Sequence, residues 1–275
     1  MMIDKLGLFI KSHPAFLDHA DPSNASLFDS PGYELPSAAG LIEISVSSDT
    51  LSKLAEHNIE LRGALGTSNR IIFDPSSTRH KAIVQFNNFS GNTLVLASGC
   101  YAEAEILFEG REHLVVLCAS DRLSSLRIVL RADRSALFYG RDCSAGRVEF
   151  FIEGPEKCII CGADCMFSAG IPIRTSDGHA IFRLDSKEIV NLRKNVLIEP
   201  HVWIGENVIV LKGAAIGRGS IIGARSIVSG RINPFSSAIG VPAREIQSGV
   251  SWTRQGRPTE SDIDAAIRNS YAPIE

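Results

Sequence analysis

Residues 196–231 read VLIEPH VWIGEN VIVLKG AAIGRG SIIGAR SIVSGR, which is six consecutive blocks of six residues. The third position of every block is a β-branched aliphatic residue, and the first position is small or β-branched. The third positions are Ile198, Ile204, Val210, Ile216, Ile222 and Val228. Glycine follows the third position at Gly205, Gly217 and Gly223.

A period of six matches neither the 3.6-residue turn of an α-helix nor the two-residue alternation of a half-buried strand. It fits a short strand followed by a tight corner, with three such units closing one triangular turn of a solenoid. The aliphatic residues would fill the interior, while small residues and glycine fit the corners. We therefore expect residues 196–231 to form two full turns of a parallel β-helix.

Apolar runs continue upstream, from Asn92 to Gly170, at irregular spacing and separated by polar turns. They predict earlier, less regular coils of the same solenoid. An extra loop should leave the solenoid near Pro172, where the register changes.

The chain divides into three predicted parts. We expect an irregular N-terminal extension or small domain over residues 1–85, the β-helix over residues 86–247 and a tail over residues 248–275. In the first part, SDTLSKLAEHN predicts one helix capped by Ser48 or Asp49. In the tail, Thr259-Glu260-Ser261-Asp262 precedes an apolar-periodic stretch and predicts a capped helix.

Composition excludes several classes of protein. The chain has 275 residues, 21% of them charged, and a formal charge of −3, so it has no overall attraction to nucleic acid or anionic membranes. No apolar stretch is long enough for a membrane span, and Lys5 and Lys11 interrupt the N-terminal one, so we expect a cytoplasmic protein. Six cysteines in a chain of this size do not indicate a disulfide scaffold.

Cys158, Cys161 and Cys165 form a C-x2-C-x3-C pattern. A zinc site would need a fourth ligand and a setting that favours thiolates. These cysteines fall in an apolar, strand-like run, where cysteine acts as a small core residue. We therefore expect no metal site here.

Three residues near the start of the regular coils stand out for their chemistry. His179 lies in IPIRTSDGHAIF (171–182), a polar loop, and histidine is the natural general base near neutral pH. By composition alone a loop histidine is usually a solvated bystander. His201 is the rival base, but its phase places it at a coil corner, where we expect it to be solvated. Trp203 should face outward, because its neighbours Val202 and Ile204 occupy interior-facing positions. Its ring would then contact either the substrate or a neighbouring subunit.

The sequence resembles the hexapeptide-repeat acyltransferases, and among them the sugar and polysaccharide O-acetyltransferases. The resemblance covers about residues 160–247. It rests on the repeat itself, the SDGH loop and the segments HVWIG (201–205), LKGAAIG (211–217), IIGARSIVS (221–229) and GVPARE (240–245). It implies an all-β fold, a left-handed parallel β-helix with an irregular N-terminal extension and a short C-terminal helix. It also implies a homotrimer with active sites in the clefts between subunits.

The resemblance also implies roles for residues. His179 matches the family's catalytic base, which takes the proton from an acceptor hydroxyl as it attacks acetyl-CoA. From their positions in the sequence, and not from the resemblance, Trp203 and Asp177 are further candidates for contacts with the substrate or the oxyanion. Residues matched to acetyl-CoA binding are Gly223, Ala224, Ser229 and Arg244, with Arg231 and Lys212 as further cations for its phosphates. Many relatives carry Thr-Lys where this chain has Ser229-Gly230, so Arg231 is expected to replace the missing lysine.

The function expected from these residues is transfer of an acetyl group from acetyl-CoA to a hydroxyl of a sugar or surface polysaccharide, without a covalent intermediate. Two alternatives stay open at this point. One is transfer of another acyl group, or transfer to the amine of a nucleotide sugar. The other is a β-helix without catalytic activity that serves as a scaffold.

Overall fold

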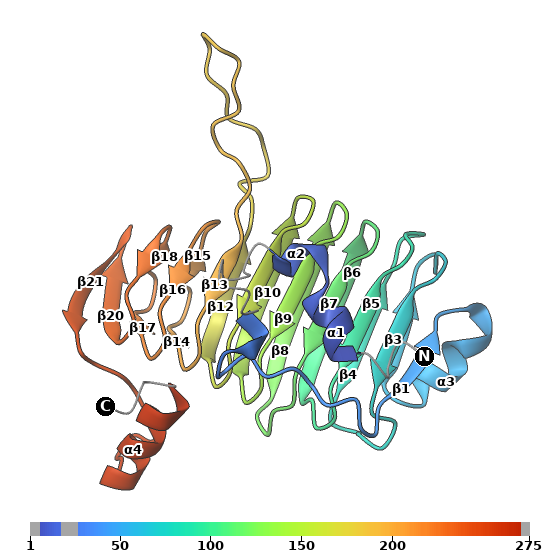
Figure 1. Ribbon diagram of the computed structural model, residues 1–275, viewed down its shortest axis with the longest axis horizontal. Helices are drawn as coiled ribbons and strands as arrows, with labels where there is room; N and C mark the ends of the chain where they lie inside the picture. Colours follow the sequence, from blue (N-terminus) through green and yellow to red (C-terminus); the bar gives the residue numbers. More distant parts are fainter. Residues whose placement is uncertain (1–5, 18–26, 271–275) are drawn as a thin grey trace.

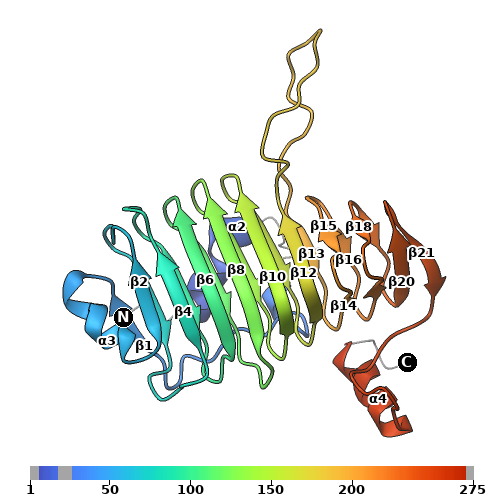
Figure 2. The same ribbon diagram turned by 180° about the vertical axis from the view of Figure 1, so that it is seen from behind.

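The computed structural model describes residues 6–17 and 27–270, and its body is a solenoid of stacked coils (Figures 1 and 2). Two long sheets run along it. One contains β1 (Ile42–Ser45), β3 (Arg70–Phe73), β5 (Thr93–Leu96), β7 (Leu114–Leu117), β9 (Ala136–Tyr139), β11 (Cys158–Cys161), β13 (Val196–Ile198), β16 (Ala215–Ile216) and β19 (Arg231–Ile232), in that order.

The second sheet begins with β2 (Ile59–Arg62), β4 (Lys81–Gln85), β6 (Ala102–Glu109), β8 (Ser124–Arg131), β10 (Ser144–Glu153) and β12 (Met166–Arg174). It continues with β14 (Trp203–Ile204), β15 (Ile209–Val210), β17 (Ile221–Ile222), β18 (Ile227–Val228), β20 (Ser236–Gly240) and β21 (Ala243–Ser248). Within the described residues, strands of successive coils pair in parallel, and only β1–β3 and β20–β21 pair antiparallel.

The coils change shape along the solenoid. In the N-terminal half each coil contributes one strand to each sheet, and Val115 pairs with Leu137, 22 positions later. Strand β12 then pairs with β14 near one end and with β15 near the other, so each later coil has three short strands. Leu197 pairs with Ala215, 18 positions later, as three hexapeptides require. This confirms the predicted two turns over residues 196–231.

The interior of the solenoid is one continuous apolar core. All six third positions of the repeat, from Ile198 to Val228, are at most 1% exposed. The irregular runs upstream supply the same core from strands of the same sheets, which confirms them as earlier coils. Cys161 and Cys165 belong to this core, so the cysteine pattern is accounted for by packing.

The solenoid begins earlier than the predicted boundary at residue 86. Strand β4 pairs in parallel with both β2 and β6, so residues 59–85 are already coils. The 22-residue repeat was not visible because its corners are polar and varied in sequence. Asn69 accepts a hydrogen bond from the backbone of Asn92 (2.8 Å), and Asn92 accepts one from the backbone of His113 (2.9 Å), so side chains rather than glycines join these corners.

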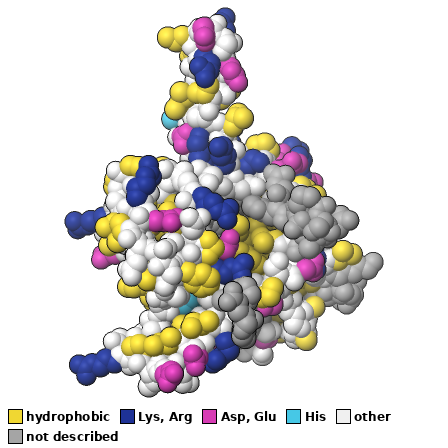
Figure 3. Space-filling view, turned by 60° about the vertical axis from the view of Figure 1, so that its left-hand side comes forward, with side chains coloured by type: hydrophobic (Ala, Val, Ile, Leu, Met, Phe, Trp, Pro, Cys, Tyr) yellow, Lys and Arg dark blue, Asp and Glu magenta, His cyan; other side chains and the backbone are white. Residues whose placement is uncertain are grey.

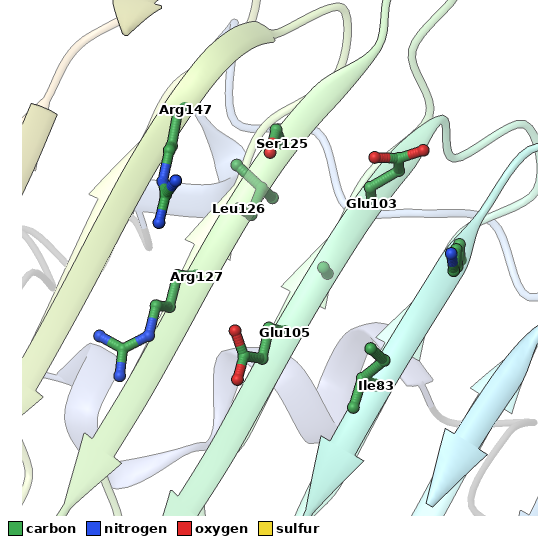
Figure 4. Close-up of a pocket in the computed structure, with 9 residues that line it drawn as sticks. Ile83, Glu103, Glu105, Ser125, Leu126, Arg127 and Arg147 are labelled. Atoms are coloured by element: carbon green, nitrogen blue, oxygen red, sulfur yellow. The ribbon is translucent and has the colours of Figure 1, made fainter. Parts of the chain in front are cut away.

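The two sheets differ in their outer faces. Helices α1 (Leu6–Lys11) and α2 (Pro14–Leu17) and the turn η2 (Leu27–Asp29) lie across the sheet that contains β7 and β9 (Figure 1). Their apolar side chains form a second core with it, so its central strands are buried on both faces. The outer face of the other sheet is solvated and carries alternating charges, among them Glu105 and Arg127 (Figure 4).

Both predicted helices are present. The first consists of η3 (Ser48–Thr50) and α3 (Leu51–Ala55), with Ser47 at its N-cap, one residue before the predicted cap. The C-terminal helix α4 (Glu260–Asn269) is capped by Thr259, whose side chain and that of Asp262 exchange hydrogen bonds with each other's backbone. This reciprocal arrangement satisfies two helix donors.

Candidate active site

The predicted loop leaves the solenoid after β12 as a long projecting arm, residues 175–195 (Figures 1 and 2). The arm is held as a hairpin, because Val190 donates a backbone hydrogen bond to Ile181 (2.8 Å) and Phe182 pairs with Ile189. Its apolar side chains are exposed, as the yellow atoms on the arm at the top of Figure 3 show. They are Ile181, Phe182, Leu184, Ile189, Val190 and Leu192, with Leu184 91% exposed.

His179 lies near the base of the arm and is exposed. Its backbone oxygen accepts a hydrogen bond from Asn191 Nδ2 at 2.8 Å, but its ring makes no hydrogen bond within residues 6–17 and 27–270. The ring borders a groove of about 340 Å³ that is also lined by Lys157 and Arg193. Both ring nitrogens of His179 are thus open to a substrate in that groove.

Asp177 and Lys212 fasten the base of the arm to the next coil. Lys212 Nζ donates to Asp177 Oδ2 (2.5 Å) and to the backbone oxygen of Asn191 (2.8 Å). Asn191 Nδ2 donates to the same Asp177 oxygen (2.9 Å). The hydrogen bond and charge of Lys212 hold the pKa of Asp177 below its usual value. Asp177 therefore positions the arm and does not touch the ring of His179, and Lys212 is already paired with a carboxylate.

His201 is buried, with 2% of its surface exposed, so the expectation of a solvated corner residue is wrong. Its Nδ1 lies 2.8 Å from Asp164 Oδ2, and its Nε2 lies 2.9 Å from the backbone oxygen of Trp252. The ring of Trp252 stacks on it, with centroids 4.4 Å apart. The phase of the repeat did not show that Trp252, from the C-terminal tail, covers this corner.

Trp203, the first residue of β14, faces outward as predicted and is 36% exposed. Its ring centroid lies 6.0 Å from that of Trp252. Met166, its partner on β12, is at the opposite end of that strand from Arg174, after which the arm departs. One chain therefore does not bring Trp203 to His179.

The residues matched to acetyl-CoA are distributed over two corners of the last coils. Gly223 and Ala224 lie in the turn between β17 and β18, and Arg244 is exposed on β21, beside Ile239 of β20. Gly223 is packed closely, because an added Cβ would lie 2.4 Å from Ile239 Cγ2.

Ser229 is exposed in the turn before β19, and exposed Arg231 opens that strand. This corner is the one from which the arm projects, since Ala215 donates to the backbone of Gly230 and Gly213 to that of Asn195. A Cβ at Gly230 would meet nothing within 4 Å, so the surface there is open. The exposed Arg231 and Arg244 suit anionic phosphates.

A model of the bacterial transferase hexapeptide family, described as six repeats, matches residues 195–230. Residues 195–230 thus carry the hexapeptide repeat of that family. The matched segment is the one whose six-residue period predicted the coils. Among residues 6–17 and 27–270, no helix is both long and apolar enough to cross a membrane.

Two curated relatives are polysialic acid O-acetyltransferases. The one from Escherichia coli O1:K1 / APEC is 37% identical over 120 residues, which are 43% of this chain and 39% of the relative. The one from Neisseria meningitidis is 32% identical over 127 residues, which are 45% of this chain and 57% of the relative. The similar segment thus spans less than two thirds of either relative.

Two solved structures share the fold. The polysialic-acid-specific acetyltransferase NeuO superposes with a TM-score of 0.64 at 24% identity, covering 77% of this chain and 98% of that one. The polysialic acid O-acetyltransferase OatWY gives a TM-score of 0.53 at 21% identity, covering 77% and 96%. The expected fold class, an all-β left-handed parallel β-helix with a short C-terminal helix, is confirmed.

Sequence reasoning missed the residues that lock the tail, namely Asp164, Trp252 and Arg254. No repeat or motif includes them. The one signal is composition, since Trp252 is one of only two tryptophans in the chain and stands in a polar segment outside every predicted element.

Proposed function

We propose that this chain transfers an acetyl group from acetyl-CoA to a hydroxyl of a sugar in a polysaccharide or its precursor, with His179 as the general base. Acceptors of the polysialic acid type are the first candidates, because the curated relatives carry that name. The observation that carries the proposal is the contrast between two histidines. The ring of His179 is exposed beside a groove, whereas both ring nitrogens of His201 are occupied and buried.

The chemistry needs one proton carrier. A sugar hydroxyl is a poor nucleophile at neutral pH, so a ring nitrogen of His179 takes its proton as the oxygen attacks the thioester carbonyl. The tetrahedral oxyanion then collapses, the carbon–sulfur bond breaks, and the imidazolium returns the proton to the leaving thiolate. A donor such as the Trp203 indole N–H or a backbone N–H would stabilise the oxyanion.

Direct transfer without an acyl-enzyme is supported by the state of the cysteines. All six are buried, and burial raises the pKa of Cys100 to about 12 and that of Cys118 further still. Only a thiolate is a strong nucleophile, so these side chains are poorly suited to carry an acetyl group. In the proposed reaction the acceptor oxygen itself is the nucleophile.

The groove beside His179 suits an acidic sugar. Lys157 and Arg193 line it with the histidine, and cationic side chains of this kind bind carboxylates through charge-assisted hydrogen bonds. Arg231, at the open corner of Gly230, and Arg244, beside Ile239 at the corner of Gly223, would take the phosphates of acetyl-CoA. Because acetyl-CoA is made in the cytoplasm, we place the reaction there.

We further propose that the working enzyme is a homotrimer. His179 and Trp203 lie toward opposite ends of β12, and the arm exposes six large apolar side chains, a surface that an isolated chain leaves in water. In a ring with threefold symmetry every subunit presents its arm to its neighbour. His179 of one subunit would then meet Trp203 of the next.

Thioester consumption by the purified protein tests the proposal. The chain is supplied with acetyl-CoA and either polysialic acid, a neutral glycan of similar length or an amino sugar, and free thiol is followed. Polysialic acid should release thiol well above the rate without acceptor. Thiol release with the amino sugar alone would indicate N-acyl transfer, and release with none would point to a scaffold.

A further inference from the structure

One corner of the solenoid carries a column of residues in the left-handed backbone conformation, one in each coil. They are Asp142 (φ 59°), Asp164 (55°), His201 (56°), Gly219 (69°) and Phe235 (55°). Each donates its backbone N–H to the coil before it, for example His201 to Ala163 (2.8 Å) and Phe235 to Arg218 (2.8 Å). This stacking places the side chains of Asp164 and His201 against each other although 37 positions separate them.

The C-terminal tail, residues 249–270, crosses this column one coil at a time, in the reverse direction. Val250 donates to the backbone of Phe235 (2.9 Å), and the hydroxyl of Ser251 donates to that of Gly219 (3.1 Å). The indole of Trp252 donates to the backbone oxygen of His201 (2.8 Å). Successive residues of the tail therefore contact successive coils at this corner.

Arg254 ends this run at the coils of Asp164 and Asp142. Its guanidinium lies 3.1 Å from Asp164 Oδ1 and donates to the hydroxyl of Ser144 at 2.9 Å. It also donates to backbone oxygens of Asp142, Asp164 and Cys165 at 3.2 to 3.4 Å. One arginine thus joins the tail to two successive coils.

His201 also links the tail to the coils. Both atoms that its ring nitrogens face, a carboxylate oxygen of Asp164 and the carbonyl oxygen of Trp252, only accept hydrogen bonds. The ring of His201 thus bridges the coil of Asp164 and the tail. Asp164 accepts from His201, from Arg254 and from Asn269 of α4 at 3.1 Å, so this single carboxylate ties together the coils, the tail and the helix.

Apolar packing of the tail is slight by comparison. A cavity of about 530 Å³ with a largely apolar lining separates α4 from Trp252 and Phe235, and Ile263 and Ile267 are more than two fifths exposed. Figure 1 shows α4 below the solenoid, joined to it by a single extended segment. The contacts that fix the tail are therefore the polar ones at the corner and the stacking of Trp252 on His201.

Trp252 is the residue of the tail that contacts the proposed active site, because its ring lies beside that of Trp203. Trp252 is stacked on His201 at an interplanar angle of 8° and contacts Trp203 at 6.0 Å and 49°. We propose that the tail is a latch that holds Trp252 against Trp203, and that Trp252, His201, Asp164 and Arg254 are positioning residues for the acyl-transfer site. The catalytic part of this inference rests on the proposed function of Trp203.

The two tryptophans supply a direct readout, because the chain contains only Trp203 and Trp252. Indole rings 6.0 Å apart couple electronically, so the near-ultraviolet circular dichroism of the protein should differ from the additive sum, which is the Trp203→Phe spectrum plus the Trp252→Phe spectrum minus that of the double variant. Arg254→Gln removes the ion pair with Asp164 and also the guanidinium that lies 5.4 Å from the centroid of the Trp252 ring. It should shift the spectrum toward that sum while the β-sheet signal and the oligomer mass stay unchanged.

Kinetics then test the positioning role. Arg254→Gln should lower kcat/KM for acetyl transfer about 10- to 100-fold, the scale of a misplacement of about 1 Å at an active site, and Trp252→Phe should act in the same direction. Arg268→Gln, which removes an exposed charge from α4, should change neither the spectrum nor the kinetics. Loss of the tryptophan coupling with unchanged kcat/KM would overturn the positioning role, and intact coupling in Arg254→Gln would overturn the latch. If the unaltered protein transfers no acetyl group, the proposed function fails, and the spectra alone decide whether the latch exists.

Discussion

The carboxylate of Asp164 and the imidazole of His201 meet at 2.8 Å inside a corner of the solenoid that the C-terminal tail covers. This contact removes His201 from the list of available bases and leaves His179 as the exposed histidine of the C-terminal coils. The same contact explains why a segment outside the repeat is ordered against it. The fold thus gives His201 a structural role and leaves the ring of His179 accessible for the proposed chemistry.

Acid should release the tail. Burial by itself would raise the pKa of Asp164, but the hydrogen bond from His201 and the charge of Arg254 outweigh it and hold the pKa below the usual value. A carboxyl of lowered pKa stabilises the fold above its ordinary pKa of about 3.9, and that contribution is lost as the pH falls through the folded value. Tryptophan coupling should therefore weaken below about pH 4.

Asp164→Asn is the control for this acid response. The variant should show weakened coupling already at pH 6 and little further change on acidification. An unaltered protein whose coupling is the same at pH 6 and pH 3 would show that Asp164 does not hold the tail.

The base of the arm should behave as one unit. Lys212→Met and Asp177→Asn each remove the contact that fixes the arm, so each should lower kcat/KM about tenfold, and the double variant should lose little more. Arg183 and Glu188, 3.9 Å apart and exposed on the arm, form the control pair. Changing both to glutamine should leave kcat/KM near its original value. Additive losses for Lys212 and Asp177 would show that they act separately.

The register of the repeat can be tested through folding. Ile216 is 1% exposed, so Ile216→Asp places a carboxylate in the core without a partner, at a cost of several kcal/mol. The soluble yield of folded protein should fall to near zero. Gly230→Asp, at an open corner, should fold normally. A soluble Ile216→Asp protein with an unchanged melting curve would show that this side chain does not face the interior.

Acetyl-CoA binding should depend on Arg244. Arg244→Glu replaces a proposed phosphate partner with a repelling charge and should raise the KM for acetyl-CoA about tenfold or more. The KM for a short thioester donor that lacks the nucleotide should change little, and Arg268→Glu on α4 should affect neither. Equal losses with both donors would assign Arg244 another role.

The sequence predicted the parts of the fold that repeat in sequence as well as in space. Ile198 to Val228 recur every six residues because three short strands close each triangular coil. The coils before residue 86 could not be predicted, since Asn69, Asn92 and His113 form equivalent corners with different side chains. The latch was also invisible, because the contacts of Asp164, His201 and Arg254 join segments far apart in the chain and follow no period.

The candidate site was predicted unevenly for a similar reason. The position of His179 on a projecting loop and the outward orientation of Trp203 follow from local pattern alone. The pairing of Lys212 with Asp177 depends on which coil lies beneath the arm, and that is decided only when the solenoid closes. The proposed site between subunits would also depend on contacts between two chains, which the pattern of a single sequence does not show.

The most direct test of the whole account is the rate of acetyl transfer by His179→Ala. General-base help is worth about 10²- to 10⁴-fold and acts on the transition state, so kcat should fall by that factor. Because His179 is exposed and its ring makes no hydrogen bond within the described residues, the melting temperature, the oligomer mass and the affinity for acetyl-CoA should be unchanged. A His179→Ala enzyme with a nearly unaltered kcat would contradict the assignment of the base and, with it, the central claim.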